Sequence, residues 1–296
     1  MSRQDDADRV VASSKTDRLV VLGRDNDATA IVVHYLAQRF DDIVTVVEEA
    51  EAPGTLLRRR ARRLGWRRVA GQVVFTTVVL PVLHRRGRAR IRSILADAGL
   101  DPTPVTDVRR VPSVNAPETI AMLRELAPAA VVVIGTRIIA RTVLQSVPAP
   151  FVNVHPGITP HYRGMHGAYW ALSEGRPELV GTTVHLVDAG VDTGEALART
   201  YFTPGPDDSI ATYFYLHVAS ALPALTDQLT VLTDARPETI PSSRATPPPG
   251  GHDPLHPPTT DALPGDGASA SADESKLWFH PTVWEYLRLR WQLGLR

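Results

Sequence analysis

The 296-residue chain contains no cysteine. Disulfide bonds, thiolate zinc sites and a catalytic thiol are therefore excluded. The N-terminus is polar and acidic and lacks the apolar core of a signal peptide, so we expect a cytoplasmic protein with a flexible segment over residues 1–17. Acidic residues are also missing from Ala52 to Ala96, a stretch that holds twelve arginines. Such a segment favours an anionic partner or a membrane surface, although a solvated basic helix would have the same composition.

Short apolar runs alternate with helical patterns along most of the chain. A buried-type strand ends at Gly23, a helix with capping residues follows, and a second strand comes after it. This βαβ opening predicts an α/β domain over residues 18–240, with a Rossmann-like, mostly parallel sheet flanked by helices. The first βα turn, GRDND, lacks the glycine pattern that binds a dinucleotide pyrophosphate, which disfavours a nicotinamide or flavin enzyme.

Three segments depart from the alternating pattern. Residues 55–97 predict a basic insertion of two or three helices; its apolar stretch of fifteen residues is shorter than a bilayer span, so interfacial membrane contact stays open. Residues 241–275 are rich in Pro, Gly, Ser, Asp and Thr, which predicts a disordered linker. Residues 276–296 regain aromatic residues and helical spacing, which predicts a C-terminal helix that docks on the domain.

Three polar residues stand near the ends of neighbouring predicted strands. Asn153 and His155 are two residues apart in the strand FVNVH, so both side chains project from one face. Asp192 lies in a glycine-flanked loop, DAGVDTG, that can bring a carboxylate to the adjacent strand. An amide, an imidazole and a carboxylate suit acyl transfer through an oxyanion, with direct attack by the substrate because no serine or cysteine nucleophile is evident. The same three residues would also suit plain turn and capping roles.

A metal site is the other chemistry that this region suggests. His161 and His166 follow His155 in the sequence, and imidazole is a common metal ligand. No carboxylate stands at ligand spacing among the three histidines. We therefore expect no metal, and we place His161 and His166 at the substrate edge or on the surface.

The two halves of this region together carry a family resemblance. NVHPGITPHYRG followed by VHLVDAGVDTG resembles the catalytic domain of the formyltransferases that use 10-formyltetrahydrofolate, which act on glycinamide ribonucleotide, methionyl-tRNA or nucleotide sugars. The resemblance covers about residues 18–235, and His185 stands seven residues before Asp192 as the family motif requires. It implies that Asn153, His155 and Asp192 are the catalytic trio. It also implies a folate pocket whose walls and backbone donors come from Gly135, Thr136, Arg137, Ile138, Ile139, Val187, Asp188, Ala189 and Gly190.

Departures from known members narrow the expected acceptor. GRDND does not reproduce the Ser/Gly-rich phosphate loop of the glycinamide ribonucleotide enzymes, and a proline-rich linker with one helix stands where methionyl-tRNA enzymes add a C-terminal barrel. The hydrolases of formyltetrahydrofolate usually place an amino-acid-binding domain before the catalytic domain, and we expect none before Leu19. The segment Tyr162, Arg163 and Gly164 resembles the YRG loop of sugar-modifying members, so we expect it to bind the acceptor.

The expected reaction therefore transfers formyl from 10-formyltetrahydrofolate to the amine of an amino sugar or nucleotide-linked sugar. That acceptor could be phosphorylated or lipid-linked, with its phosphates held by the arginines of residues 55–97. Two alternatives remain: a formyltetrahydrofolate hydrolase, and a non-catalytic folate-binding or partner module. Nucleic acid is disfavoured as a partner, because the rest of the chain is acidic and the basic segment lacks interleaved aromatic residues.

Overall fold

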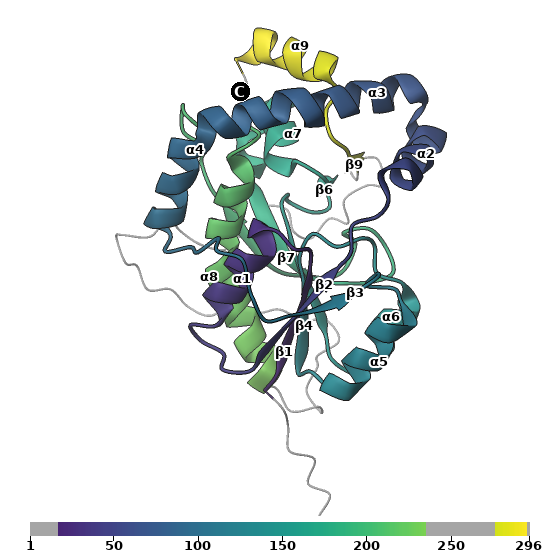
Figure 1. The fold of residues 1–296 in the computed structure, drawn as a ribbon. Helices are drawn as coiled ribbons and strands as arrows, with labels where there is room; N and C mark the ends of the chain where they lie inside the picture. The colour runs from purple at the N-terminus through teal and green to yellow at the C-terminus, as the bar shows by residue number, and fades with distance from the viewer. Residues whose placement is uncertain (1–16, 235–275, 295–296) are drawn as a thin grey trace, which may run out of the picture.

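The computed structural model describes residues 17–234 and 276–294. Its centre is a seven-stranded sheet (Figure 1) whose strands are, in spatial order, β3 (Val108–Val111), β2 (Ile43–Glu48), β1 (Leu19–Gly23), β4 (Ala130–Val133), β5 (Phe151–His155), β7 (Gly181–Leu186) and β8 (Ala196–Tyr201). The pairs from β3 to β5 are parallel, and β7 and β8 are antiparallel additions at one edge. The predicted α/β fold with a mostly parallel sheet is therefore confirmed.

Helices cover both faces of this sheet. On one face, α1 (Asp27–Leu36) and α8 (Tyr213–Asp234) pack against Leu19 and Val21 of β1. On the other face, α5 (Pro117–Leu126) and the short α6 (Arg141–Leu144) pack against Val20 and Leu22. The sheet is thus buried on both sides, which explains the continuous apolar runs of its central strands.

The basic insertion forms a helical layer at one end of the sheet (Figure 1). It consists of α2 (Pro53–Leu64), α3 (Trp66–Val74), a π-helical turn (Phe75–Val79) and α4 (Leu80–Asp97). Gly65, with φ +82°, allows the chain to turn between α2 and α3. Within the described residues, no helix is long and apolar enough to span a bilayer.

The C-terminal segment begins with a strand that the sequence did not indicate. A helix alone was predicted over residues 276–296, yet β9 (Lys276–Trp278) comes first and pairs in parallel with β6 (Tyr162–Gly164). α9 (Val283–Leu293) then starts in a capping box, in which Thr282 and Glu285 satisfy each other's backbone N–H groups. The predicted linker over 241–275 and nearly all of the predicted flexible N-terminus lie outside the described residues.

Candidate active site

The structure brings the three predicted catalytic residues together at the end of β5. Asn153 and His155 share one face of β5, while Val152 and Val154 point to the opposite face and pack in the core with α8. Asp192 comes from the glycine-flanked loop between β7 and β8. Its Oδ2 lies 3.4 Å from Nδ1 of His155.

A fourth side chain, His185 on β7, joins this group. His185 is the antiparallel partner of Asn153, and its Nε2 lies 3.1 Å from Nδ2 of Asn153 and 3.9 Å from Oδ1 of Asp192. Nδ1 of His185 lies 2.7 Å from the carbonyl oxygen of Leu186. Because a carbonyl only accepts, Nδ1 carries the proton and Nε2 accepts a hydrogen bond from the Asn153 amide. The sequence showed the spacing of His185 from Asp192 but gave this histidine no contact within the site.

The imidazole of His155 is almost fully buried, with 2% of the residue exposed. Its Nε2 lies 2.7 Å from the carbonyl oxygen of Tyr162, and its Nδ1 faces the Asp192 carboxylate. Burial lowers the pKa of His155, and the carboxylate and the Tyr162 carbonyl oppose this change by favouring the cation. Both ring nitrogens face acceptors, so the geometry fits a ring that shares a proton with Asp192.

The segment predicted to bind the acceptor holds the candidate catalytic groups in place. The backbone N–H of Gly164 donates to Oδ2 of Asp192 at 2.9 Å, and Nε of Arg163 donates to the carbonyl of Val191 at 2.8 Å. Tyr162 contributes its carbonyl to His155 and donates its hydroxyl to Glu174. These contacts fix the loop in which Asp192 adopts a left-handed backbone, φ +52°. Acceptor binding by this segment stays a prediction.

The first predicted folate loop follows β4 and is anchored to β2. The backbone N–H of Arg137 donates to Oε1 of Glu48 at 2.8 Å, and its guanidinium Nε lies 2.6 Å from Oε2 of the same carboxylate. The side chain of Glu48 is completely buried and also lies 3.5 Å from Nε of Arg24. Ile139 packs in the core, whereas Ile138 is 62% exposed. The Glu48 carboxylate therefore anchors the loop to β2, while the Ile138 side chain faces solvent.

The second predicted folate loop uses several of its own polar groups internally. Asp188 accepts from the backbone N–H of Gly190 at 2.9 Å and from the hydroxyl of Thr193 at 2.7 Å. The N–H of Val187 donates to the carbonyl of Phe151 at 2.8 Å. These bonds shape the loop that delivers Asp192, and folate binding by residues 187–190 stays a prediction.

The two other histidines of the motif contact the C-terminal segment. Nε2 of His166 lies 2.8 Å from Nδ1 of His280, and the carbonyl of His161 accepts from the indole N–H of Trp278 at 3.3 Å. Burial lowers the pKa of His166 to about 3 and that of His280 to about 4. In the part of the chain that the structure describes, no group of three or more His, Asp or Glu side chains is arranged to hold a metal ion.

Residues 18–216, which contain the whole of this cluster, match the model of the Formyl transferase family. The chain belongs to that family. A methionyl-tRNA formyltransferase of Desulfotalea psychrophila is 32% identical over 153 residues, which cover 49% of this chain and 45% of the relative. The chain therefore spans less than half the length of this relative.

The chain is also similar, at low sequence identity, to solved structures of formyltransferases. A glycinamide ribonucleotide transformylase from Symbiobacterium toebii is 19% identical, with a TM-score of 0.49 and coverage of 75% of this chain and 89% of that one. A sugar N-formyltransferase from a Shewanella species is 17% identical, with a TM-score of 0.45 and coverage of 74% and 70%.

Proposed function

We propose that this family member transfers a formyl group from 10-formyltetrahydrofolate to the amine of a small acceptor, an amino sugar or a nucleotide-linked sugar. The observation that carries the reaction type is the cluster of Asn153, His155, His185 and Asp192 at the end of β5. Formyl transfer through a tetrahedral intermediate needs a hydrogen-bond donor for the oxyanion and groups that transfer protons. The Asn153 amide can supply the first, and the imidazole and carboxylate pair can supply the second.

Each member of the cluster has a separate role in the proposed reaction. Nδ2 of Asn153 uses one N–H on His185 and has a second N–H for the oxygen of the formyl group as negative charge develops there. The cationic form of His155, held against Asp192, adds positive charge to the same site. The attacking amine loses a proton and the folate nitrogen that leaves gains one, and the Asp192 carboxylate is placed to pass that proton through a water molecule.

The loop after β4 supplies the proposed wall of the donor site. Ile138 is a large apolar side chain that is 62% exposed, and the carboxylate of Glu48 fixes the backbone beneath it through Arg137. A flat aromatic ring system such as a pterin would cover the Ile138 side chain and remove it from water. Residues 187–190 would form the other wall, next to Asp192.

A cavity at the start of α1 supports a polyhydroxylated acceptor. It measures about 160 Å³ and is lined in part by Arg24, Asp25, Asn26 and Asp27, at the end of β1. Arg24 and Arg110, which pairs with Asp25, balance the two carboxylates here, so the cavity has no surplus positive charge for a phosphate, which is the group that a glycinamide ribonucleotide acceptor would bring. Oδ2 of Asp25 is paired with Arg110 at 2.7 Å, and the remaining carboxylate oxygens can accept hydrogen bonds from sugar hydroxyls, which supports a sugar acceptor.

The test is turnover by the full chain. The protein is incubated with 10-formyltetrahydrofolate and, separately, a panel of nucleotide-linked amino sugars, glycinamide ribonucleotide and initiator methionyl-tRNA. Tetrahydrofolate release and a formyl mass gain on each acceptor are measured, with Asp192→Asn as the control for the site. Formylation of an amino sugar by the wild type but not by the variant supports the proposal. Donor hydrolysis without an acceptor, formylation of the tRNA alone, or folate binding without turnover each contradicts it.

A further inference from the structure

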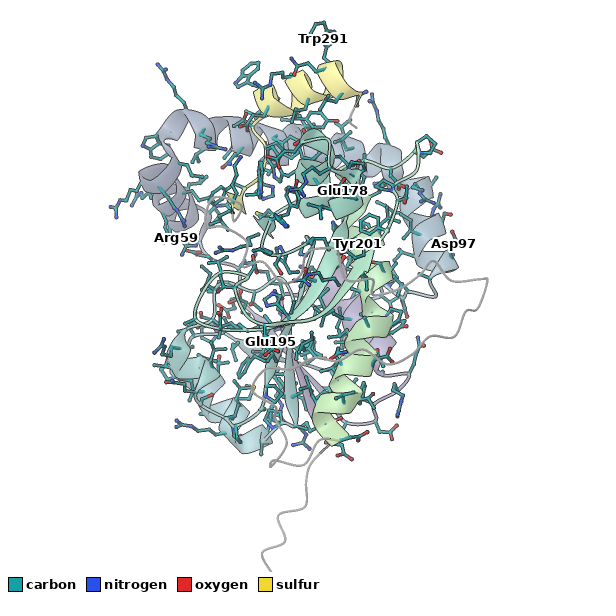
Figure 2. All side chains as sticks on the ribbon, turned by 180° about the vertical axis from the view of Figure 1, so that it is seen from behind. Arg59, Asp97, Glu178, Glu195, Tyr201 and Trp291 are labelled. Carbon is teal, nitrogen blue, oxygen red and sulfur yellow. The ribbon has the colours of Figure 1, made fainter. Side chains whose placement is uncertain are left out.

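The outer surface of α9 carries a row of exposed apolar side chains. Tyr286 and Leu289 face inward and are buried, whereas Trp284, Leu287 and Trp291 are 73%, 48% and 86% exposed. Spacings of three and four residues place these three on one side of the helix, and we call them the α9 stripe. Figure 2 shows Trp291 projecting from α9 away from the body of the molecule.

α9 rests on the basic insertion, so the two form one layer at the same end of the molecule (Figure 1). The rings of Phe75 and Tyr286 lie 5.4 Å apart, and Nη2 of Arg68 lies 3.6 Å from Oε1 of Glu285. The helical run beneath α9 exposes a second apolar row with a spacing of four residues, made of Val74, Val78 and Val82. Apolar groups on two adjoining helices are thus open to solvent in one layer.

Positive charge dominates the same layer. The stretch from Ala52 to Ala96 holds twelve arginines and no acidic residue, and α9 adds Arg288 and Arg290. Within the described residues, only three of the twelve arginines lie within salt-bridge distance of a carboxylate: Arg59, Arg68 and Arg90. The layer therefore carries a large excess of cationic groups next to exposed tryptophan.

We propose that this layer docks on the surface of an anionic lipid bilayer, with the α9 stripe at the level of the headgroups and the arginines on lipid phosphates. Tryptophan favours the membrane interface, and an amphipathic helix with basic flanks lies flat there. A nucleic acid would engage the arginines and could stack bases on the tryptophans, but it would leave Leu287 and the valine row in water. A second copy of the chain would set one arginine cluster against another. The inference is independent of the acceptor and goes beyond the proposed formyl transfer.

Vesicle co-sedimentation of the full chain tests this proposal. Vesicles of phosphatidylcholine alone are compared with vesicles that also contain phosphatidylglycerol, at low and high salt. We expect binding to the anionic vesicles at low salt, weak binding to the neutral ones, and release at high salt because the charges are screened. Absence of binding to anionic vesicles at low salt overturns the proposal.

Matched variants assign the binding to the layer. Replacing Trp284 and Trp291 together by serine should weaken binding to the anionic vesicles at least tenfold, and Val231→Ser on α8, also an exposed apolar residue, should not. Circular dichroism confirms that the variants fold. Wild-type vesicle binding by the double tryptophan variant overturns the proposal.

A pair of charge variants completes the design. Arg62→Gln with Arg67→Gln should weaken binding by roughly fivefold for each arginine, and Arg39→Gln with Arg124→Gln, which removes the same charge elsewhere, should have little effect. Equal effects of the two pairs overturn the assignment to this layer. Two further results also overturn it: a dimer, measured by light scattering, that the tryptophan variant dissociates, or RNA binding that outcompetes vesicles.

Discussion

The sheet domain and the helical layer differ in how their polar side chains are satisfied. In the sheet domain the polar side chains near the site bond to one another: Asn153 to His185, and Arg137 to the buried Glu48. In the layer formed by α2–α4 and α9, arginines outnumber carboxylates, and three tryptophans, Trp66, Trp284 and Trp291, face solvent. The difference agrees with two separate proposals: a reaction at the polar cluster on β5, and a docking surface on the helical layer.

The two regions meet where β9 lies beside β6. The backbone N–H of Met165 donates to the carbonyl of Trp278 at 3.1 Å, and Gly164 with φ +95° fits there because a Cβ would collide with that same carbonyl. Gly164 is the residue whose N–H holds Asp192. The C-terminal segment therefore supports the loop that positions the candidate catalytic carboxylate.

Removing the Trp278 side chain should break this junction and have the largest effect on stability. Trp278 is 9% exposed and stacks on Trp170 with ring centroids 4.6 Å apart. Trp278→Ala should lower the free energy of unfolding by about 3–5 kcal/mol, the usual range for a buried tryptophan. Urea denaturation measures the change. Trp291→Ala in the same layer is the control and should lie within about 0.5 kcal/mol of wild type, and equal losses in the two variants would contradict the division into buried and outward tryptophans.

Removing the Asn153 amide should leave the fold intact and slow formyl transfer strongly. Loss of one oxyanion donor lowers the rate about 100- to 1000-fold, or about 2.7–4 kcal/mol in the barrier. The kcat/KM for formyl transfer measures the effect in Asn153→Ala, and circular dichroism checks the fold. A rate close to wild type would remove Asn153 from the mechanism. The contrast with Trp278→Ala then separates residues that act on the substrate from residues that hold the site.

The periodicity of apolar and polar residues along the chain predicted the sheet domain and much of the candidate site. The alternation in FVNVH placed Asn153 and His155 on one face, and the glycines around Asp192 indicated a loop able to reach them. Both depend on neighbours in the chain, so periodicity can reveal them.

Pairings between distant segments left no such signal. β3 is four residues long and pairs with β2 about sixty residues earlier, and β6 and β9 are three-residue strands that pair across more than a hundred residues. The contacts of Glu48 with Arg137 likewise join β2 to the loop after β4. The residues next to Glu48 in the sequence do not indicate that Arg24 and Arg137 are its partners, because tertiary packing brings these residues together.

Neutralising Glu48 should have a smaller effect that is specific to the donor loop. Glu48→Gln keeps the size of the side chain but leaves the guanidinium groups of Arg24 and Arg137 without a carboxylate, so the free energy of unfolding should fall by about 1–3 kcal/mol. Because Arg137 anchors the loop that carries Ile138, the KM for 10-formyltetrahydrofolate should rise more than kcat falls. Steady-state kinetics with varied donor concentration measures both parameters. A fall in kcat alone would place Glu48 in the chemical step and contradict an anchoring role.

Acid should loosen the junction between the C-terminal segment and the sheet domain through the pair His166 and His280. Burial lowers the pKa of His166 to about 3 and of His280 to about 4 from an ordinary value of 6.5, so between pH 4 and 6.5 the unfolded chain binds more protons than the folded one. Stability should be full above pH 6.5 and fall as the pH drops, by up to ~1.4 kcal/mol per pH unit for each histidine. His280→Gln removes one of these protons, so its stability should depend less steeply on pH over that interval. Urea midpoints from pH 4.5 to 7 measure the two slopes. An unchanged slope in His280→Gln would show that the pair does not couple the C-terminal segment to acid, and would point instead to the other buried histidines, His155 and His217, whose pKa values burial also lowers.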